Sequence, residues 1–170
     1  SDKSWDLIAV DAFHQPYIPF YLTTREFFEE TREHLTTNGV VMINVGKTPG
    51  DSAVADAIAA TMRDVYPSVY SFNVGQFNRL VVATKQPRGP DNLPAGIEGR
   101  GVVADNLLAT PESLMARASA MPPDVARLAR EIAPKLVEVQ PGGIILTDDK
   151  APVEWLTDQM IIDYATAKQD

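Results

Sequence analysis

An apolar segment that ends at a carboxylate lies near the start of the sequence, and it constrains the fold more than any other stretch. Trp5 and the run Leu7–Val10 are interrupted only by Asp6, and Asp11 follows at once. A strand buried on both faces of a parallel sheet has this continuous apolar pattern. In open α/β sheets, ligands bind just beyond the carboxyl ends of the strands. The pattern makes Asp11 a candidate for chemistry, although an aspartate at a strand end often only caps a turn.

The next sixty residues predict alternating helices and strands. Thr23 and Glu26 have the spacing of a capping box, which predicts a helix that ends at residues 37–39, where Gly39 supplies a positive φ. A second doubly buried strand is expected over residues 40–45. A second helix is expected over about 51–66, where apolar residues recur at helical spacing before a proline.

Two further strands are predicted over residues 68–74 and 78–84. The residues between them are too few for a crossover helix, so these strands must be antiparallel. The element order predicts an α/β fold: a partial doubly wound sheet of parallel strands with a final antiparallel strand, followed by a mostly helical C-terminal tail.

The rest of the chain divides into a Gly/Pro-rich connection and a tail. We expect a sheet domain, a linker or surface loop, and a helical tail that packs on the sheet domain, over residues 1–86, 87–109 and 110–170. Three helices and one extended run are predicted in the tail, at 110–121, 123–133, 152–167 and 142–149. The helix over 123–133 carries an apolar stripe of Val125, Leu128, Ala129 and Ile132.

Charge and composition exclude several classes of function. The net charge of −8 and the pI near 4.7 argue against nucleic acid or an anionic membrane as the main partner, and they suit a small cationic amine. The chain has no cysteine, so thiolate chemistry is excluded. Asp148 and Asp149 lack the spacing of a calcium loop, so no metal is expected. No apolar run reaches the length of a membrane span, and we expect a soluble, cytoplasmic protein.

The first strand presents an edge that its composition does not suit. No strand precedes it in the sequence, yet it is apolar on both faces, which is typical of a central strand. We therefore expect an incomplete sheet, whose first edge pairs either with an N-terminal half lying outside this sequence or with a second copy in a homo-oligomer.

Several ordered motifs together resemble the second half of a spermidine synthase-like (polyamine aminopropyltransferase-like) domain, which has the class I S-adenosylmethionine-dependent methyltransferase-type fold. The resemblance covers most of residues 4–86 and a patch at 146–154. The motifs are Trp5-Asp6-Leu7-Ile8-Ala9-Val10-Asp11-Ala12-Phe13, Ile18-Pro19-Phe20-Tyr21-Leu22-Thr23-Thr24-Arg25-Glu26-Phe27-Phe28, Asn38-Gly39-Val40-Val41-Met42-Ile43-Asn44-Val45, Phe77-Asn78-Arg79-Leu80-Val81-Val82-Ala83-Thr84-Lys85 and Leu146-Thr147-Asp148-Asp149-Lys150-Ala151-Pro152-Val153-Glu154.

The resemblance implies roles for particular residues. Asp11 matches the aspartate that orients the attacking amine and helps to deprotonate it, and residues 12–22 match a gate over the substrate. The implied substrate-binding residues are Ala12, His14, Gln15, Tyr17 and Gln76. The implied donor in a complete domain is decarboxylated S-adenosylmethionine or S-adenosylmethionine.

The sequence also departs from the family pattern. His14 stands where the family has a second aspartate, and Asn73-Val74-Gly75-Gln76 replaces a Tyr-Pro-Ser-Gly run that helps to bind polyamine. The Gly-rich nucleotide loop of the family falls upstream of Ser1, and no G-x-G-x-x-G motif occurs in the chain, so its cofactor-binding residues are unknown.

Three readings follow from the sequence. The first is an aminopropyl transferase that lacks its nucleotide-binding half in this chain. The second is a non-catalytic fragment or assembly module of the same fold. The third is an S-adenosylmethionine-dependent methyltransferase that acts on another acceptor.

Overall fold

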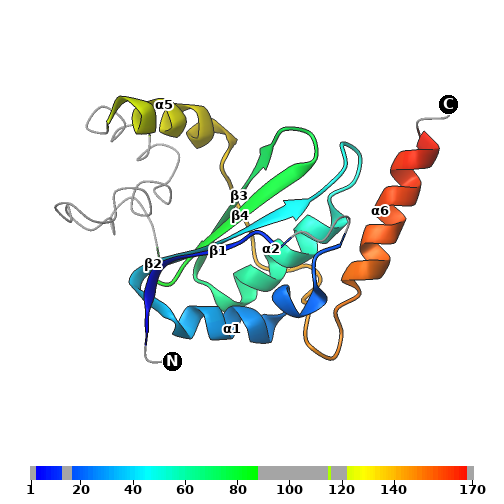
Figure 1. Cartoon of the computed structure of the whole chain (residues 1–170), viewed down its shortest axis with the longest axis horizontal. Coiled ribbons are helices and arrows are strands. Elements are labelled where there is room, and N and C mark those ends of the chain that lie inside the picture. The colour runs from blue at the N-terminus through cyan, green and yellow to red at the C-terminus, as the bar shows by residue number, and fades with distance from the viewer. Residues whose placement is uncertain (1–2, 13–16, 88–114, 116–121, 168–170) are drawn as a thin grey trace.

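The computed structural model describes residues 3–12, 17–87, 115 and 122–167. Its centre is a five-stranded sheet in the order β1-β2-β4-β3-β5 (Figure 1). In chain order the elements are β1 Trp5–Val10, α1 Arg25–Glu33, β2 Leu35–Gly46, α2 Ala53–Val65, β3 Ser68–Val74, β4 Asn78–Thr84, α5 Pro123–Ile132, β5 Val137–Glu138 and α6 Val153–Ala167. Short 3₁₀ turns lie at Phe20–Leu22 and Ala133–Lys135.

The strand directions confirm the predicted fold class. β1 pairs with β2 in parallel, while β4 lies between β2 and β3 and is antiparallel to both. β1, β2 and β3 therefore run in one direction and β4 in the other. The short strand β5 pairs antiparallel with β3, at Ser71 and Tyr70, and it was not predicted from the sequence. Two residues are too few to give a periodic pattern.

One face of the sheet is closed by helices. α1 and α2 lie together against it, as Figure 1 shows, and α6 reaches the same side. Apolar side chains of β2, β4 and these helices form the larger core, with Phe28, Ile58, Met62 and Val41 all fully buried. Burying one such side chain contributes roughly 1.5–3 kcal/mol, so this face holds most of the stability of the chain.

The other face is covered only in part. α5 lies over it and packs on a smaller core that includes Tyr70 and Phe72 of β3 (Figure 1). The apolar stripe predicted for this helix is wrong at Leu128, which is 49% exposed, and the residue buried here is Ala126. The side chains of Val125 and Ala129 lie outside those described.

The predicted end of the first helix is wrong. α1 stops at Glu33, and Leu35 already belongs to β2, where it pairs with Trp5 of β1. Gly39 serves the sheet and has no positive φ. A Cβ atom on Gly39 would lie 2.9 Å from the carbonyl oxygen of Trp5 and 2.8 Å from Cβ of Leu35. The glycine therefore permits the close approach of β1 at an irregularity in the β1–β2 register.

The N-terminus of α1 is capped one residue later than predicted. The Oγ1 atom of Thr24 accepts a hydrogen bond from the backbone N–H of Phe27 at 3.4 Å, so Thr24 is the N-cap. Thr23 instead donates its hydroxyl to the carbonyl of Phe20 at 2.6 Å. Glu26 does not complete a capping box, because its carboxylate accepts from the backbone N–H of Asp148 at 3.0 Å.

The prediction that β1 is buried on both faces is wrong for this chain. β1 is an edge strand, and Trp5 and Leu7 are 54% and 49% exposed. Ile8 and Val10, which point to the other face, are only partly buried against the larger core. β1 thus combines the composition of a central strand with the place of an edge strand.

The tail is fastened to the sheet domain through a buried leucine. The N–H of Leu146 donates to Oγ1 of Thr61 at 2.9 Å, and its carbonyl accepts from the N–H of Arg25 at 2.8 Å. Leu146 is fully buried, whereas Asp148 and Asp149 lie in an exposed turn closed by a bridge between Thr147 and Lys150. The run over 142–149, predicted to be extended, forms no strand, and it places Asp148 and Asp149 in this exposed turn.

Part of the predictions falls on residues outside those described. These are the helix over 110–121, of which only the helical Met115 is described, and nearly all of the connection over 87–109. The three-part division of the chain stays a prediction.

Candidate functional site

Asp11 and Asn44 form the centre of the candidate site. Asp11 directly follows β1, and Asn44 is the corresponding residue of β2, because the parallel register pairs Val10 with Ile43 one step earlier. The side-chain Nδ2 of Asn44 donates to Oδ1 of Asp11 at 3.2 Å. Two neighbouring parallel strands thus bring a carboxylate and an amide together at one edge of the sheet.

A cavity of about 280 Å³ opens beside this pair, and we call it the Asp11 cavity. β4 is the next strand in the sheet and contributes Asn78, which is half-buried. The cavity is lined by Ala9, Val10, Asp11, Met42, Asn44, Val74, Asn78 and Leu80. Three polar side chains therefore stand on an otherwise apolar wall.

The carboxylate of Asp11 is open to a ligand. Among the described residues it has the single hydrogen bond from Asn44 and no ion pair, and the side chain is exposed. A carboxylate with free lone pairs can hold an ammonium group by charge or accept a proton from it. Asn44 holds one oxygen and thereby orients the carboxylate, and no described residue donates a hydrogen bond to the second oxygen.

An apolar groove of about 430 Å³ continues from the Asp11 cavity on the same face of the sheet. The two share Met42, Val74 and Leu80. The groove extends below α5 and is bordered there by Leu128 and Ile132. The part of this face that α5 leaves uncovered therefore adjoins the candidate site.

The predicted substrate-binding residues after Asp11 are only partly visible. Ala12 is half-buried next to Asp11, and His14 and Gln15 lie outside the described residues. The hydroxyl of Tyr17 donates to Oδ1 of Asp158 on α6 at 2.7 Å. This hydrogen bond to a carboxylate, together with the negative charge of that carboxylate, raises the pKa of Tyr17 above its usual value.

Gln76 is not among the residues that line the Asp11 cavity. It lies in the exposed turn between β3 and β4, where Gly75 adopts a φ of 63°. The carbonyl oxygen of Gln76 accepts from Nζ of Lys47 at 3.2 Å. The structure thus places Gln76 in the turn that joins two lining residues, Val74 and Asn78.

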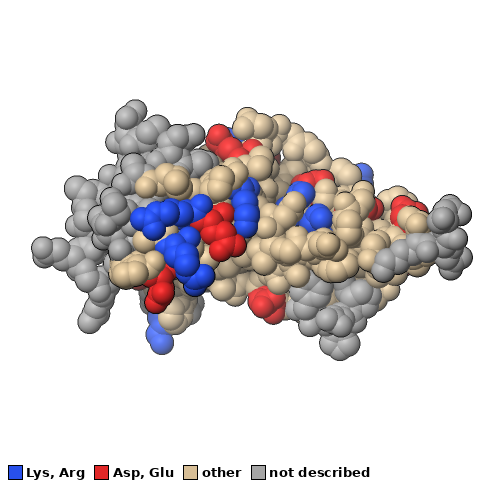
Figure 2. Space-filling model, turned by 90° about the horizontal axis from the view of Figure 1, so that it is seen from above, with Lys and Arg blue, Asp and Glu red and all other residues tan. Residues whose placement is uncertain are grey.

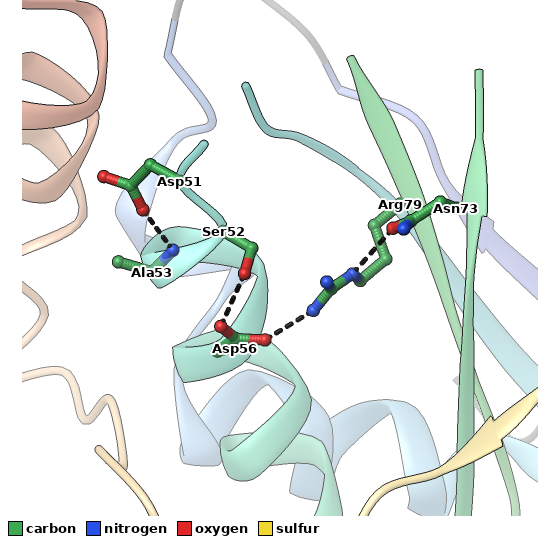
Figure 3. A network of polar contacts seen from close by, with 6 residues as sticks. All are labelled: Asp51, Ser52, Ala53, Asp56, Asn73 and Arg79. Atoms are coloured by element: carbon green, nitrogen blue, oxygen red, sulfur yellow. Dashed lines mark hydrogen bonds and ion pairs between the residues drawn. The ribbon is translucent and has the colours of Figure 1, made fainter. Parts of the chain in front are cut away.

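A second cleft, of about 530 Å³, lies between α2, β3 and the segment that follows β5. Figure 3 shows its polar network: the guanidinium of Arg79 pairs with Asp56 through Nη1 and with Oδ1 of Asn73 through Nε at 3.1 Å. Ser52 donates to the other oxygen of Asp56 at 2.7 Å. Lys135, the other cation lining the cleft, pairs with a glutamate. Both cations are neutralised, so this network joins α2 to the β3–β4 hairpin rather than offering an anion site.

Figure 2 shows the face of the molecule that is at the top of Figure 1, on the side of α5. Charged side chains of both signs lie on this face. Lys and Arg side chains gather toward one end, with Asp and Glu side chains among them.

No group of three or more metal-ligating side chains occurs within the described part of the chain. None of its described helices is long and apolar enough to span a membrane.

Two lining residues, Asn44 and Asn78, were not predicted as site residues. Asn44 is the only polar residue in the run Val40–Val45, and that interruption of a buried strand was an available signal. Asn78 had no comparable signal, because its place beside Asn44 depends on the antiparallel register that pairs Gly46 with Asn78.

Comparison with known sequences gives two informative matches, although no family model matches. The chain is 31% identical over 176 residues to a "Probable polyamine aminopropyl transferase" of Bifidobacterium longum, covering 97% of this chain and 38% of that protein. It is 37% identical over 83 residues to a "Polyamine aminopropyltransferase" of Vibrio vulnificus, covering 48% of this chain and 27% of that protein. These matches support a spermidine synthase-like family. The chain spans well under half the length of these curated relatives.

Solved structures give weaker likenesses. A probable spermidine synthase from Corynebacterium glutamicum aligns with a TM-score of 0.45 and 16% identity, over 83% of this chain and 48% of that chain. The spermidine synthase from Thermotoga maritima aligns with a TM-score of 0.43 and 14% identity, over 70% and 45%.

Proposed function

We propose that this chain carries the acceptor side of a spermidine synthase-like transferase, with Asp11 as the residue that holds and helps to deprotonate an acceptor amine. The observation that carries the proposal is the carboxylate of Asp11 at the carboxyl end of β1, fixed by Asn44 and open to the Asp11 cavity. The names of the two sequence relatives supply the class of reaction.

The reaction would move an aminopropyl group from decarboxylated S-adenosylmethionine to the amine. The nitrogen lone pair attacks the propyl carbon bonded to the sulfonium, the C–N bond forms as the C–S bond breaks, and methylthioadenosine leaves as a neutral thioether. The nitrogen loses one proton, which Asp11 can accept. An amine attacks only when unprotonated, so a carboxylate beside it serves both to hold it and to free its lone pair.

The other parts of the site have subordinate roles in this proposal. Asn44 orients Asp11, and Asn78 offers a further polar contact to the amine. Ala12, His14, Gln15 and Tyr17 stay predicted substrate-binding residues, and His14 and Gln15 lie outside the described residues. Gln76 contributes through the turn that carries it. The formal net charge of −8 suits a cationic acceptor, and a cytoplasmic location suits this chemistry.

We further propose that more protein completes the donor side of the site. The curated relatives are more than twice as long as the matched part, and the exposed β1 edge with Trp5 and Leu7 is apolar enough to be covered in a complete domain. The nucleotide-binding residues would then come from outside this chain.

A second candidate is a non-catalytic module in which the β1 edge pairs with a partner, such as a second copy. The exposure of Trp5 and Leu7 on an edge strand favours it. It predicts assembly through that edge and no dependence of any activity on Asp11.

The test compares three forms of the full gene product: the unchanged protein, Asp11→Asn and the control Asp6→Asn. Asp6 is a nearby carboxylate that does not line the cavity, and it accepts a hydrogen bond of 2.8 Å from the hydroxyl of Thr36. Formation of methylthioadenosine from decarboxylated S-adenosylmethionine is measured with a panel of amines. Asp11→Asn is expected to lower kcat/KM by about 10²–10⁴-fold, the usual contribution of a general base. Equal activity of Asp11→Asn and the unchanged protein overturns the role of Asp11. Methyl transfer from S-adenosylmethionine, without aminopropyl transfer, would identify a methyltransferase.

A further inference from the structure

α6 contacts two segments that border the Asp11 cavity, although it contributes no residue to the lining of that cavity. Its Asp158 accepts the hydrogen bond from Tyr17, which lies in the connection between β1 and α1. Its Tyr164 packs edge-on against Phe77 in the β3–β4 turn, with ring centroids 5.8 Å apart and an interplanar angle of 84°. The two contacts use different parts of one helix.

The first half of α6 is held by the core. Val153, Leu156 and Met160 recur at helical spacing on its buried side, and they are 1%, 9% and 7% exposed. The segment that leads into α6 is fixed between α1 and α2 through Leu146. This half of the helix therefore gives the exposed Asp158 a fixed base, and Tyr164 lies one turn beyond Met160 on the same side, where it is half-buried.

The two segments that α6 contacts are exposed only in part. In the first, Phe20 and Tyr21 are 40% and 59% exposed, whereas Ile18, Thr23 and Thr24 are buried. Between Tyr17 and α1, the backbone forms one 3₁₀ turn, with Leu22 N–H bonded to Pro19 and Thr23 N–H bonded to Phe20. In the second, Phe77 is 47% exposed in a tight turn, and its own carbonyl oxygen accepts a hydrogen bond of 2.9 Å from the N–H of Lys47. The exposed parts of a chain open most readily, so an added contact to such a part changes its order most.

We propose that α6 positions both borders of the Asp11 cavity, with Asp158 as the positioning residue for Tyr17 and Tyr164 as the positioning residue for Phe77. Phe77 directly precedes the lining residue Asn78, and Tyr17 follows the lining residue Asp11 by six positions in the connection to α1. The contacts themselves do not depend on the proposed function. Their effect on turnover rests on it.

The direct test is amide hydrogen exchange in the full gene product, with and without substitutions on α6. Asp158→Asn is expected to speed exchange of the Leu22 and Thr23 amides by about threefold to tenfold, the loss expected for a hydrogen bond to a charged group at an exposed site. Asp163→Asn is the control, since it makes the same charge change on the same helix. Unchanged exchange at these two amides, or equal acceleration by the control, overturns the role of Asp158.

A second variant tests the other contact. Tyr164→Leu keeps an apolar side chain on α6 and removes the edge-on ring contact, so exchange of the Lys47 amide, which is bonded to Phe77, is expected to rise by about threefold. The Leu22 and Thr23 amides should not respond. If both segments respond equally to Tyr164→Leu, the substitution loosens the whole helix, and separate positioning by its two residues is refuted.

Turnover then separates positioning from general destabilisation. For Asp158→Asn, KM for the acceptor amine is expected to rise about threefold to tenfold with kcat within about twofold, and Asp158→Glu is expected to restore most of the loss. A fall in kcat at constant KM contradicts positioning of the acceptor. If the unchanged protein transfers no group to any amine, the proposed function fails, while the exchange results still decide whether α6 orders these segments.

Discussion

The two faces of the sheet differ in how completely they are covered. The face that α1 and α2 cover holds a continuous core in which Phe28, Ile58 and Val41 have no exposed surface. The opposite face holds a smaller core under α5, and from there an apolar groove runs to the Asp11 cavity. The closed face accounts for the folding of the chain, and the open face carries the candidate site. A site on the less covered face suits the proposal that further protein completes it.

The largest expected effect comes from truncating a phenylalanine on the closed face. Phe28→Ala should lower the free energy of unfolding by about 3–5 kcal/mol, because it removes a fully buried ring and leaves a cavity. The matched change Phe77→Ala removes a ring that is 47% exposed and should cost about 1 kcal/mol or less. Chemical denaturation of both variants measures the difference. Similar costs would contradict the contrast between the buried ring on the closed face and the exposed ring in the β3–β4 turn.

A smaller effect is expected where β1 joins β2. Gly39→Ala places a Cβ atom 2.9 Å from the carbonyl oxygen of Trp5, and a backbone atom cannot move aside easily, so we expect a loss of about 1–3 kcal/mol. Gly50→Ala is the control, because no atom lies within 4 Å of its added Cβ. Thermal unfolding that is equally altered in the two variants would show that β1 does not pack as closely as described.

The closed face also predicts a dependence on pH. Burial raises the pKa of Tyr66 from 10.0 to about 12, although its hydrogen bond with Thr31 opposes this. The folded state keeps the Tyr66 proton at pH values where the unfolded chain loses it. The contribution of this group to the free energy of unfolding is therefore fully present below about pH 10. It falls as the pH rises from about 10 to about 12, by up to about 1.4 kcal/mol per pH unit.

Tyr66→Phe separates this term from the other tyrosines. It should cost about 1–2 kcal/mol at neutral pH, because the hydroxyl also donates to the carbonyl of Phe28 at 3.2 Å. It should also remove the part of the alkaline destabilisation that Tyr66 causes. Denaturation midpoints measured from pH 8 to 12 test both expectations, and an unchanged alkaline slope in Tyr66→Phe would rule out Tyr66 as its source.

The sequence predicted the features that depend on local patterns. Long apolar runs predicted β1 to β4, and the short connection at Gly75 predicted the antiparallel pairing of β3 with β4. It failed where a distant contact decides. Gly39 was assigned to a helix end because glycine often has that role, but its neighbour is the backbone of Trp5, which lies far away in sequence.

The candidate site was predictable to a similar depth. Asp11 could be singled out because a charged residue that ends an apolar run is a local signal. Its pairing with Asn44 follows from the parallel register, and the presence of Asn78 follows from the position of β4 in the sheet. The contact between Tyr17 and Asp158 joins residues 141 positions apart, and no pattern along the chain indicates it.

The central claim is that this chain supplies the acceptor side of a transferase whose donor side lies in further protein. Calorimetric titration with methylthioadenosine tests it most directly, with the 170-residue chain beside the full product of its gene. We expect no binding by the chain alone and saturable binding by the full product, unchanged by Asp11→Asn because Asp11 is assigned to the acceptor. Binding of equal affinity by the chain alone would refute a donor side in further protein, since the nucleotide site would then lie within these residues.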